Sequence, residues 1–475
     1  MIHKEEKFKK KGKLLCIIKK GMSIMRRNWK HRIRQMSSAQ IIVGFYLTAV
    51  TVGFLLLSIP AALKPGVELD LINRLFIAVS AVSVTGLTPV STAETFSTFG
   101  YFILAFIFQI GGIGVMTLST FIWLLIGKKI GLKERQLIMM DHNQSKLSGL
   151  VNLMRNVLLL IFAIEAIGAL VLTLHFHQYY LDWKEAFLHG FFASVSATTN
   201  AGFDITGASF VPYANDYFVQ VVTVLLITLG AIGFPVLIEV KHFFLKRKEK
   251  RKFQFSLFAK LTSIMFLALL AVGTLLILLL EQNAFMAGKS WHEAFFYAFF
   301  QSAATRSGGV ATMDVSEFTL PTLLIMSAMM FIGASPSSVG GGIRTTTFAL
   351  NILFLFYYAR GSKTIKIFRR EIHEDDITKS VAVSMFAIII CSTSVIILTI
   401  TESFSLTEII FEVCSAFGTT GLSMGITSGL SDVGKILIII LMFIGRIGML
   451  VFILMLRRPK TEPDYHYPKE RIIIG

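Results

Sequence analysis

Four glycines recur at similar intervals in a chain that is otherwise rich in apolar residues. Gly86, Gly202, Gly309 and Gly421 are 116, 107 and 112 residues apart, and each follows a short amphiphilic stretch. Backbone carbonyls from four such loops can replace the hydration shell of a potassium ion, and glycine permits the dihedral angles that turn successive carbonyls toward one axis. A single glycine is more simply explained as loop punctuation or a helix-packing position. Four at one repeat position predict an ion-selectivity filter.

Hydroxyl residues accompany these glycines. They either add side-chain oxygens to the filter or brace its loops, and they are Thr85, Thr199, Thr305, Thr419 and Thr420. A short helix before each loop would direct its partially negative C-terminal end toward the pore, which favours a cation over an anion.

The elements that carry these residues are membrane helices. With 54% hydrophobic residues, 16% charged residues and a mean hydropathy of +0.68, the chain is typical of a bilayer protein. Eight apolar stretches are long enough to span, near 39–60, 98–126, 151–174, 216–240, 255–280, 322–358, 378–401 and 433–456. Four shorter stretches are not, near 71–83, 184–197, 291–304 and 406–417. Short apolar helices before glycine-rich backbone are typical of re-entrant segments.

Direct comparison of the segments supports a fourfold repeat. Ser80–Leu87 (SAVSVTGL) and Ser415–Leu422 (SAFGTTGL) are identical at five of eight positions, and Trp183–Phe203 aligns with Trp291–Val310 after a one-residue gap. We therefore predict an all-α membrane protein of four membrane–pore–membrane repeats with pseudo-fourfold symmetry, containing eight transmembrane helices and four re-entrant pore helices. The predicted units are a basic cytosolic arm (1–38), repeats at 39–127, 151–245, 255–358 and 378–457, and a cytosolic tail (458–475).

Charge sets the predicted orientation. Most of the lysine and arginine residues that give the net charge of +17 lie in short runs, within residues 1–38, 127–150, 241–254, 359–380 and 457–475. The loops predicted on the opposite side of the membrane hold only Lys64, Lys289 and Lys435. The positive-inside rule places both termini in the cytoplasm and the glycine loops outside a cell membrane. These runs do not indicate nucleic-acid binding, and the three cysteines have no metal-ligand spacing.

The motifs SVTGL, TTNAGF, TRSGGV and GTTGL, with IGASPSSVGGGIRTTT and GRIG, resemble the Trk/Ktr/HKT superfamily of potassium transporters, and most closely its Ktr-type membrane subunit. The resemblance implies one filter glycine per repeat and K⁺ as the permeant ion, since glycine rather than serine occupies the first position. Its implied filter residues are Val84, Thr85, Gly86, Thr199, Asn200, Ala201, Gly202, Ser307, Gly308, Gly309, Thr419, Thr420 and Gly421. The third motif, SGGV, departs from the usual TAGF, so we expect looser ion selectivity.

The sixth apolar stretch, 322–358, is too long for one straight span and is interrupted by residues 333–347, which are rich in glycine and hydroxyls. This pattern indicates either an internal gate or a cytosolic turn between two half-length helices. The resemblance implies an intramembrane loop that obstructs the pore below the filter, carried by Gly333, Ala334, Ser335, Pro336, Gly340, Gly341 and Gly342.

Three ionisable residues lie within or beside apolar stretches. For Arg446, the resemblance implies a place in the cavity beside the gate; the alternative is structural pairing with a carboxylate or with loop carbonyls. Arg306 either braces the third filter loop through Glu317, Asp314 or Glu412, or tunes the local ion concentration. Glu165 is expected to pack against Arg155 or a neighbouring helix.

The sequence also bears on cofactors, partners and alternative functions. The chain shows no nucleotide-binding motif, so we expect no organic cofactor. The resemblance implies a homodimer in membrane lipid and a cytosolic ring of nucleotide-binding regulatory subunits; the basic loops are either its docking surfaces or lipid-facing. A sodium-coupled or sodium-permeable transporter of the same fold, or less favourably an alternating-access transporter, remains the alternative. A membrane enzyme would need convergent acid–base residues, which the spans lack.

Overall fold

A computed structural model of the chain describes residues 37–114, 139, 150–248, 253–362, 364–456, 468, 470 and 472. Residues 1–36 of the predicted arm (1–38), residues 115–126 of the predicted span 98–126, the loop at 127–149 apart from residue 139, and most of the tail lie outside these residues. The fold is helical, as predicted; among the described residues the only sheet is one antiparallel pair, β1 (Lys366–Ile367) and β2 (Arg370–Glu371).

Four long helices begin the four predicted repeats, and all are long and apolar enough to cross a membrane. They are α2 (Ser38–Leu57), α8 (Leu150–Phe176), α12 (Leu257–Glu281) and α16 (Glu374–Thr401). Serine residues cap the N-terminal ends of two of these helices. The hydroxyls of Ser37 and Ser256 accept hydrogen bonds from backbone N–H groups of the first turn.

The four short stretches form separate helices within two residues of the predicted bounds. These pore helices are α3 (Leu71–Ser83), α9 (Trp183–Thr198), α13 (Trp291–Ala304) and α17 (Leu406–Gly418). Two begin at capping boxes, in which Ser290 pairs with Glu293 and Ser405 with Glu408. After each pore helix the chain passes through a glycine loop and a short helical segment: α4 (Thr92–Thr95), η2 (Val211–Tyr213), η3 (Val315–Glu317) and η4 (Ile426–Gly429). A further short segment, η1 (Pro60–Ala62), lies between α2 and α3.

The sequence predicted an interruption only in the third repeat, but the second helix of every repeat ends before its apolar stretch does. These helices are α5 (Thr98–Ile113), α10 (Tyr217–Ala231), α14 (Leu320–Ile332) and α18 (Asp432–Ile447). Two are followed by helices at sharp angles, α11 (Phe234–Lys248) at 104° and α19 (Met449–Leu456) at 98°. In the third repeat, α15 (Thr345–Ala359) follows a loop.

The cause of these breaks is a glycine with a positive φ in each repeat. Gly114, Gly233, Gly333 and Gly448 have φ values of 90°, 102°, 72° and 90°, which continue no α-helix. An isoleucine precedes each of them. The Ile-Gly pair alone does not mark a break, because it also occurs inside helices, at Ile110-Gly111, Ile167-Gly168 and Ile444-Gly445.

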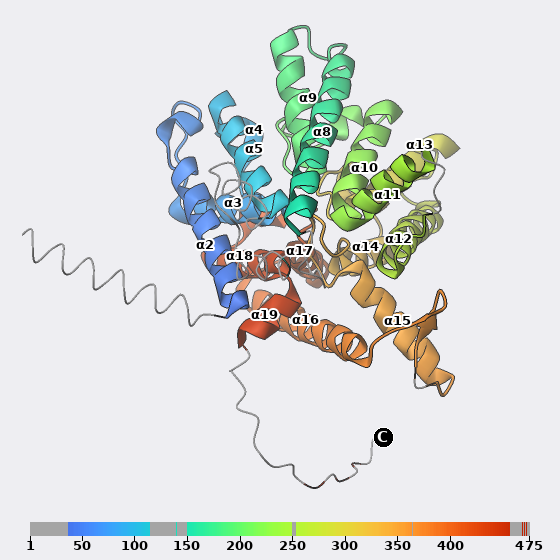
Figure 1. Cartoon of the computed structure of the whole chain (residues 1–475). Coiled ribbons are helices and arrows are strands. Elements are labelled where there is room, and N and C mark those ends of the chain that lie inside the picture. Colours follow the sequence, from blue (N-terminus) through green and yellow to red (C-terminus); the bar gives the residue numbers. More distant parts are fainter. Residues whose placement is uncertain are drawn as a thin grey trace, which may run out of the picture.

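The repeats close into a ring, because each second helix packs against the pore helix of the next repeat. The contacts run from α5 to α9, from α10 to α13, from α14 to α17 and finally from α18 back to α3. Figure 1 shows the same closure: the chain circles from blue α2 through green α8 to orange α16, and red α19 returns beside α2. This cyclic packing brings the four glycine loops to one centre.

Candidate functional site

The four predicted glycines meet at the centre of the ring. A Cβ built on Gly86 would lie 2.8 Å from Gly202 Cα, and one on Gly202 would lie 3.0 Å from Gly309 Cα. A Cβ on Gly421 would lie 3.1 Å from Gly309 Cα and 3.0 Å from Gly86 Cα, which closes the circle. All four have positive φ, between 68° and 96°. Only glycine satisfies both the dihedral angle and the close approach.

A second strained position accompanies each glycine. Two residues before it, Val84, Asn200, Ser307 and Thr419 have φ values of 58°, 52°, 71° and 46°. A positive φ is rare for residues with a Cβ and is an outlier for β-branched valine and threonine. Backbone strain of this kind costs about 1–3 kcal/mol per residue and clusters at functional sites. Each filter loop thus carries positive φ at two positions, which bends an otherwise extended backbone in the same way in all four repeats.

Serine side chains hold the first and fourth loops in this conformation. The hydroxyl of Ser80 accepts a hydrogen bond from Gly86 N–H, and that of Ser415 accepts one from Gly421 N–H, both at 3.1 Å. Each serine lies six residues before its glycine. In the second repeat, Ser196 at that position donates to the carbonyl of Phe203 at 2.6 Å. The third repeat has Ala303 there, so its loop lacks this brace.

The threonine hydroxyls favour the bracing alternative. Thr199 Oγ1 donates to the Val195 carbonyl at 2.6 Å and Thr305 Oγ1 donates to the Ser302 carbonyl at 2.7 Å, both within their pore helices. Thr85 Oγ1 lies 2.6 Å from the hydroxyl of Ser83. Thr420 Oγ1 is buried without a hydrogen-bond partner in the described structure. The hydroxyls of Thr85, Thr199 and Thr305 are therefore engaged in hydrogen bonds within their own repeats.

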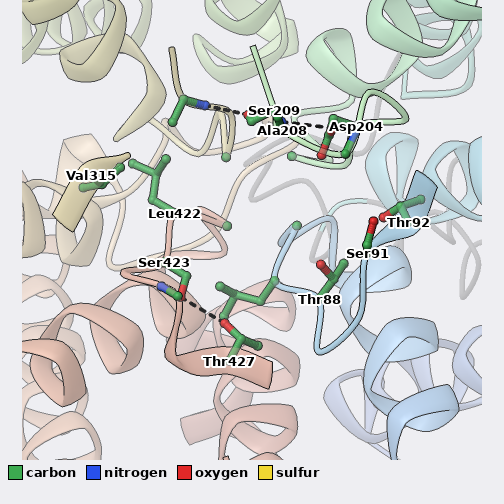
Figure 2. Close-up of a pocket in the computed structure, with 18 of the residues that line it drawn as sticks. Thr88, Ser91, Thr92, Asp204, Ala208, Ser209, Val315, Leu422, Ser423 and Thr427 are labelled. Carbon is green, nitrogen blue, oxygen red and sulfur yellow. Dashed lines mark hydrogen bonds between the residues drawn. The ribbon is translucent and has the colours of Figure 1, made fainter. Parts of the chain in front are cut away.

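A cavity of about 480 Å³ opens on one side of the glycine ring. Figure 2 shows it enclosed by loops from all four repeats, with Thr88, Asp204, Val315 and Ser423 among the lining residues. The described lining includes the carboxylates of Asp204 and Asp314 and neither lysine nor arginine. Its electrostatic character favours cations.

The other side of the ring is covered by the interrupted segment, which in the structure spans residues 333–344 because α15 begins at Thr345. This 333–344 loop is buried except for the partly exposed Arg344. Gly340 lies against the third filter loop, since a Cβ there would be 2.5 Å from Ser307 Oγ. Gly341 lies against the fourth, where a Cβ would be 2.6 Å from Thr419 Oγ1. The predicted loop residues thus contact the filter loops directly.

The 333–344 loop is fixed to the second repeat by three backbone hydrogen bonds. Ser335 N–H donates to the Ala231 carbonyl at 3.0 Å, and Val339 N–H donates to the Gly230 carbonyl at 3.2 Å. In return, Phe234 N–H donates to the Ser337 carbonyl at 2.9 Å. The loop amides thereby satisfy carbonyls that the end of α10 leaves without partners.

Arg446 caps another of these helix ends. Its side chain is 6% exposed and donates hydrogen bonds to the carbonyls of Gly111 and Gly112 at the end of α5. Backbone carbonyls were one of the two kinds of partner that the sequence suggested for Arg446 in a structural role; the other was a carboxylate. The position is also next to the pore elements, because a Cβ on Gly112 would lie 3.0 Å from Thr199 Cβ and 3.1 Å from Val339 Cγ1.

The predicted partners of Arg306 are wrong. Its guanidinium donates to the carbonyls of Met329 at 2.6 Å and Gly333 at 3.5 Å, at the end of α14. Glu412 instead accepts hydrogen bonds from Ser423 and Thr427. A carbonyl cluster at a helix end offers a buried cation an alternative to a carboxylate, which sequence spacing did not reveal.

Glu165 packs as predicted against a neighbouring helix. Gln109 of α5 donates a hydrogen bond to its carboxylate at 2.5 Å. Of the two alternatives, the neighbouring helix is therefore the partner that the structure shows.

Comparisons with known proteins identify the family and the fold of the chain. The family model TrkH, described as a cation transport protein, matches residues 4–463. Ktr system potassium uptake protein D of Bacillus subtilis (strain 168) is 59% identical over 451 residues, covering 95% of this chain and 100% of that protein. Ktr system potassium uptake protein B of the same organism is 36% identical over 438 residues, covering 91% and 95%. The crystal structure of the potassium transporter TrkH from Vibrio parahaemolyticus has the same fold, with a TM-score of 0.69, 19% identity and coverage of 90% and 86%.

Proposed function

The chain belongs to the TrkH family of membrane cation transport proteins, and from this premise we propose that it takes up potassium through one central pore. The permeant ion is the substrate, coordinated by backbone carbonyls of the filter loops that end at Gly86, Gly202, Gly309 and Gly421. The observation that carries the proposal is the closed ring of these glycines, each with positive φ and each against the next. A symmetric ring of peptide oxygens matches the ligand set that a dehydrated potassium ion requires.

The 333–344 loop is the gate in this proposal, and Arg446 supports it. The loop lies against Ser307 and Thr419 on the side of the filter opposite the open cavity, where it obstructs an ion leaving the filter. Arg446 holds the end of α5 beside Val339 of the loop. Displacement of the loop would open the path to the cytoplasm.

The cellular arrangement follows the charge distribution and the relatives. We propose a multi-pass protein of the cell membrane, with both termini cytoplasmic and the 480 Å³ cavity facing outward. Two copies would form a dimer, and a cytosolic ring of nucleotide-binding subunits would regulate the gate. The high identity to a subunit of a Ktr potassium uptake system supports this assignment of partners.

Sodium permeation or coupling is the second candidate, and the third filter loop favours it. Gly308 and Gly309 are consecutive, and Ala303 lacks the hydroxyl that braces the first and fourth loops. A loop with two consecutive glycines and without this hydroxyl can adjust its oxygens to a smaller ion.

Flux of labelled rubidium into liposomes containing the purified protein tests both candidates. We expect rubidium entry that follows its own gradient and is blocked by potassium. A requirement for an inward sodium gradient would select the coupled transporter, and no flux of either ion would overturn the proposal. Growth of a potassium-uptake-deficient bacterium at limiting potassium provides the filter test: the parent chain should restore growth, whereas Gly202→Ser should restore it poorly or change the ion preference. Equal growth would remove Gly202 from the filter.

A further inference from the structure

Arg306 is among the largest completely buried side chains, and it lies between the third filter loop and the end of α14. Its backbone directly precedes Ser307, which carries the positive φ of that loop. Its guanidinium reaches the Met329 and Gly333 carbonyls, where α14 breaks and the 333–344 loop begins. Arg306 is therefore part of the third filter loop through its main chain, and its side chain binds the end of α14. We call this end of α14, Met329–Gly333, the hinge of the 333–344 loop.

Among the described residues, the carbonyls of Met329 and Gly333 are the only polar groups that bind the Arg306 guanidinium. No described carboxylate forms an ion pair with Arg306, and its Nε atom is buried without a partner. The last carbonyls of a helix carry partial negative charge, so they stabilise the guanidinium electrostatically. A buried cation that lost them would be left without compensation, which is strongly unfavourable. Arg306 must therefore move together with Met329 and Gly333.

The hinge and the loop are also tightly joined. Gly333 has no space for a side chain, because a Cβ there would overlap the Gly341 carbonyl. Ala334 N–H donates to the same carbonyl at 3.1 Å. On the filter side, Ser307 Oγ donates to the Thr419 carbonyl at 2.5 Å, linking the third filter loop to the fourth. A continuous set of contacts thus runs from the loop, through Arg306, to two filter segments.

We propose that Arg306 is a positioning residue that couples the 333–344 loop to the third filter loop, so that displacement of the loop changes the ion preference of the filter. The inference rests on the filter and gate of the proposed function. When the hinge moves, the guanidinium follows its carbonyls and pulls the adjacent Ser307, which alters the position of the filter oxygens. Gating and selectivity are then one linked equilibrium.

A double-mutant cycle in liposomes tests this coupling. Gly333→Ala displaces the loop by overlap with Gly341, and Arg306→Lys keeps the charge but loses the two-armed guanidinium. We expect Gly333→Ala alone to change the rubidium-to-sodium permeability ratio at least threefold. In the Arg306→Lys background, the same change should raise flux without altering the ratio. An identical ratio change in both backgrounds, or none in either, overturns the inference.

Arg74→Gln is the matched control for the cycle. Arg74 also lies on a pore helix and donates to a backbone carbonyl, that of Leu69 at 3.1 Å, but it contacts neither the hinge nor the loop. Gly333→Ala should change the permeability ratio equally with and without Arg74→Gln. Failure of the parent chain to transport rubidium would count against the proposed function, whereas a parent that transports with an additive Arg306 cycle would count against the coupling alone.

The unmodified protein provides a test that does not depend on the folding of the variants. Linkage is reciprocal, so an ion that orders the filter must also stabilise the loop. We expect amide hydrogen exchange in residues 333–344 to be at least threefold slower in potassium than in the impermeant N-methylglucamine. Exchange in the hairpin at 364–372 should be equal in the two salts. Equal exchange in residues 333–344 would show that Arg306 transmits nothing.

Discussion

At the residue scale, the proposed filter contains positions where a side chain is excluded by both conformation and space. Gly421 has φ 94°, and a Cβ there would overlap the Thr85 carbonyl oxygen, which is one of the proposed ion ligands. Gly66 also has a positive φ, 81°, but nothing lies within 4 Å of its Cβ position. Alanine substitutions at these two glycines therefore distinguish the effect of backbone strain alone from the effect of a side chain that overlaps the neighbouring loop.

We expect Gly421→Ala to abolish rubidium flux, because the methyl group would displace the neighbouring filter loop. Gly66→Ala should retain flux while losing about 1 kcal/mol of stability, the typical cost of a left-handed conformation for a residue with a Cβ. Liposome flux and thermal unfolding of the purified variants measure the two effects. Normal flux through Gly421→Ala would show that the fourth loop is not part of the ion path.

Arg446 provides a prediction about stability. Replacement by methionine leaves the Gly111 and Gly112 carbonyls without the guanidinium donor. Each buried polar group that loses its partner costs about 1–3 kcal/mol. Arg446→Met should therefore unfold at a clearly lower temperature than the parent, whereas Arg360→Met, which removes an exposed arginine, should change little. Equal unfolding of the two variants would show that these hydrogen bonds do not stabilise α5.

At the element scale, polar side chains fasten the first helix of a repeat to the start of the second. Glu281 at the end of α12 accepts hydrogen bonds from Thr319, which precedes α14. Glu402 after α16 binds Ser431 before α18 in the same way. The second repeat uses a different pair: His175 in α8 lies 2.6 Å from Asp216, the N-cap of α10.

The pair in the second repeat gives a pH-dependent prediction. Partial burial raises the pKa of Asp216, but hydrogen bonds from His175, Tyr179 and the Val219 backbone outweigh burial and hold the pKa below its usual 3.8. A lowered pKa stabilises the folded state at pH values above the ordinary pKa, and this stabilisation is lost as the pH falls through the folded-state pKa. Asparagine caps a helix as well as aspartate does, so Asp216→Asn mainly removes the negative charge at the start of α10 and beside His175. It should cost about 0.3–1 kcal/mol at pH 7, and the difference from the parent should shrink below about pH 4.

Thermal unfolding of the parent and Asp216→Asn between pH 7 and pH 3 measures this difference. Asp375→Asn, which alters an exposed carboxylate in the first turn of α16, is the control and should behave like the parent. A difference for Asp216→Asn that is independent of pH would mean that hydrogen-bond geometry, rather than charge, fastens α8 to α10.

Sequence reasoning identified the helices better than the backbone geometry within them. Apolar run length located the pore helices, since this signal is local. The breaks after α5, α10 and α18 were missed because hydropathy is insensitive to φ. At the filter, the glycines were found from their spacing, whereas the positive φ of Val84 and Thr419 was not, because a β-branched side chain carries no preference for that conformation. The carbonyl partners of Arg306 likewise arise from tertiary packing.

At the scale of the whole molecule, the closed ring fixes which surfaces share one side of the membrane. Each repeat contributes to the lining of the 480 Å³ cavity, and Thr88, Ala208, Asp314 and Ser428 come from the four repeats in turn. Because a re-entrant helix and its loop return to the side from which they entered, all four positions must face the same compartment. In the orientation that we propose from the positive-inside rule, that compartment is the cell exterior.

Cysteines introduced singly at these four positions should all react with a membrane-impermeant maleimide added to intact cells. Cys16 in the N-terminal arm is replaced by serine in all these variants. Of the other native cysteines, Cys391 is buried and Cys414 is only partly accessible, so this parent should give a low background. A cysteine at Tyr358, an exposed residue near the end of α15 on the proposed cytosolic side, should react only after the membrane is permeabilised. Labelling of even one cavity position from the cytosolic side alone would be incompatible with the ring, since its loop could not then supply oxygens to the axis shared by the other three.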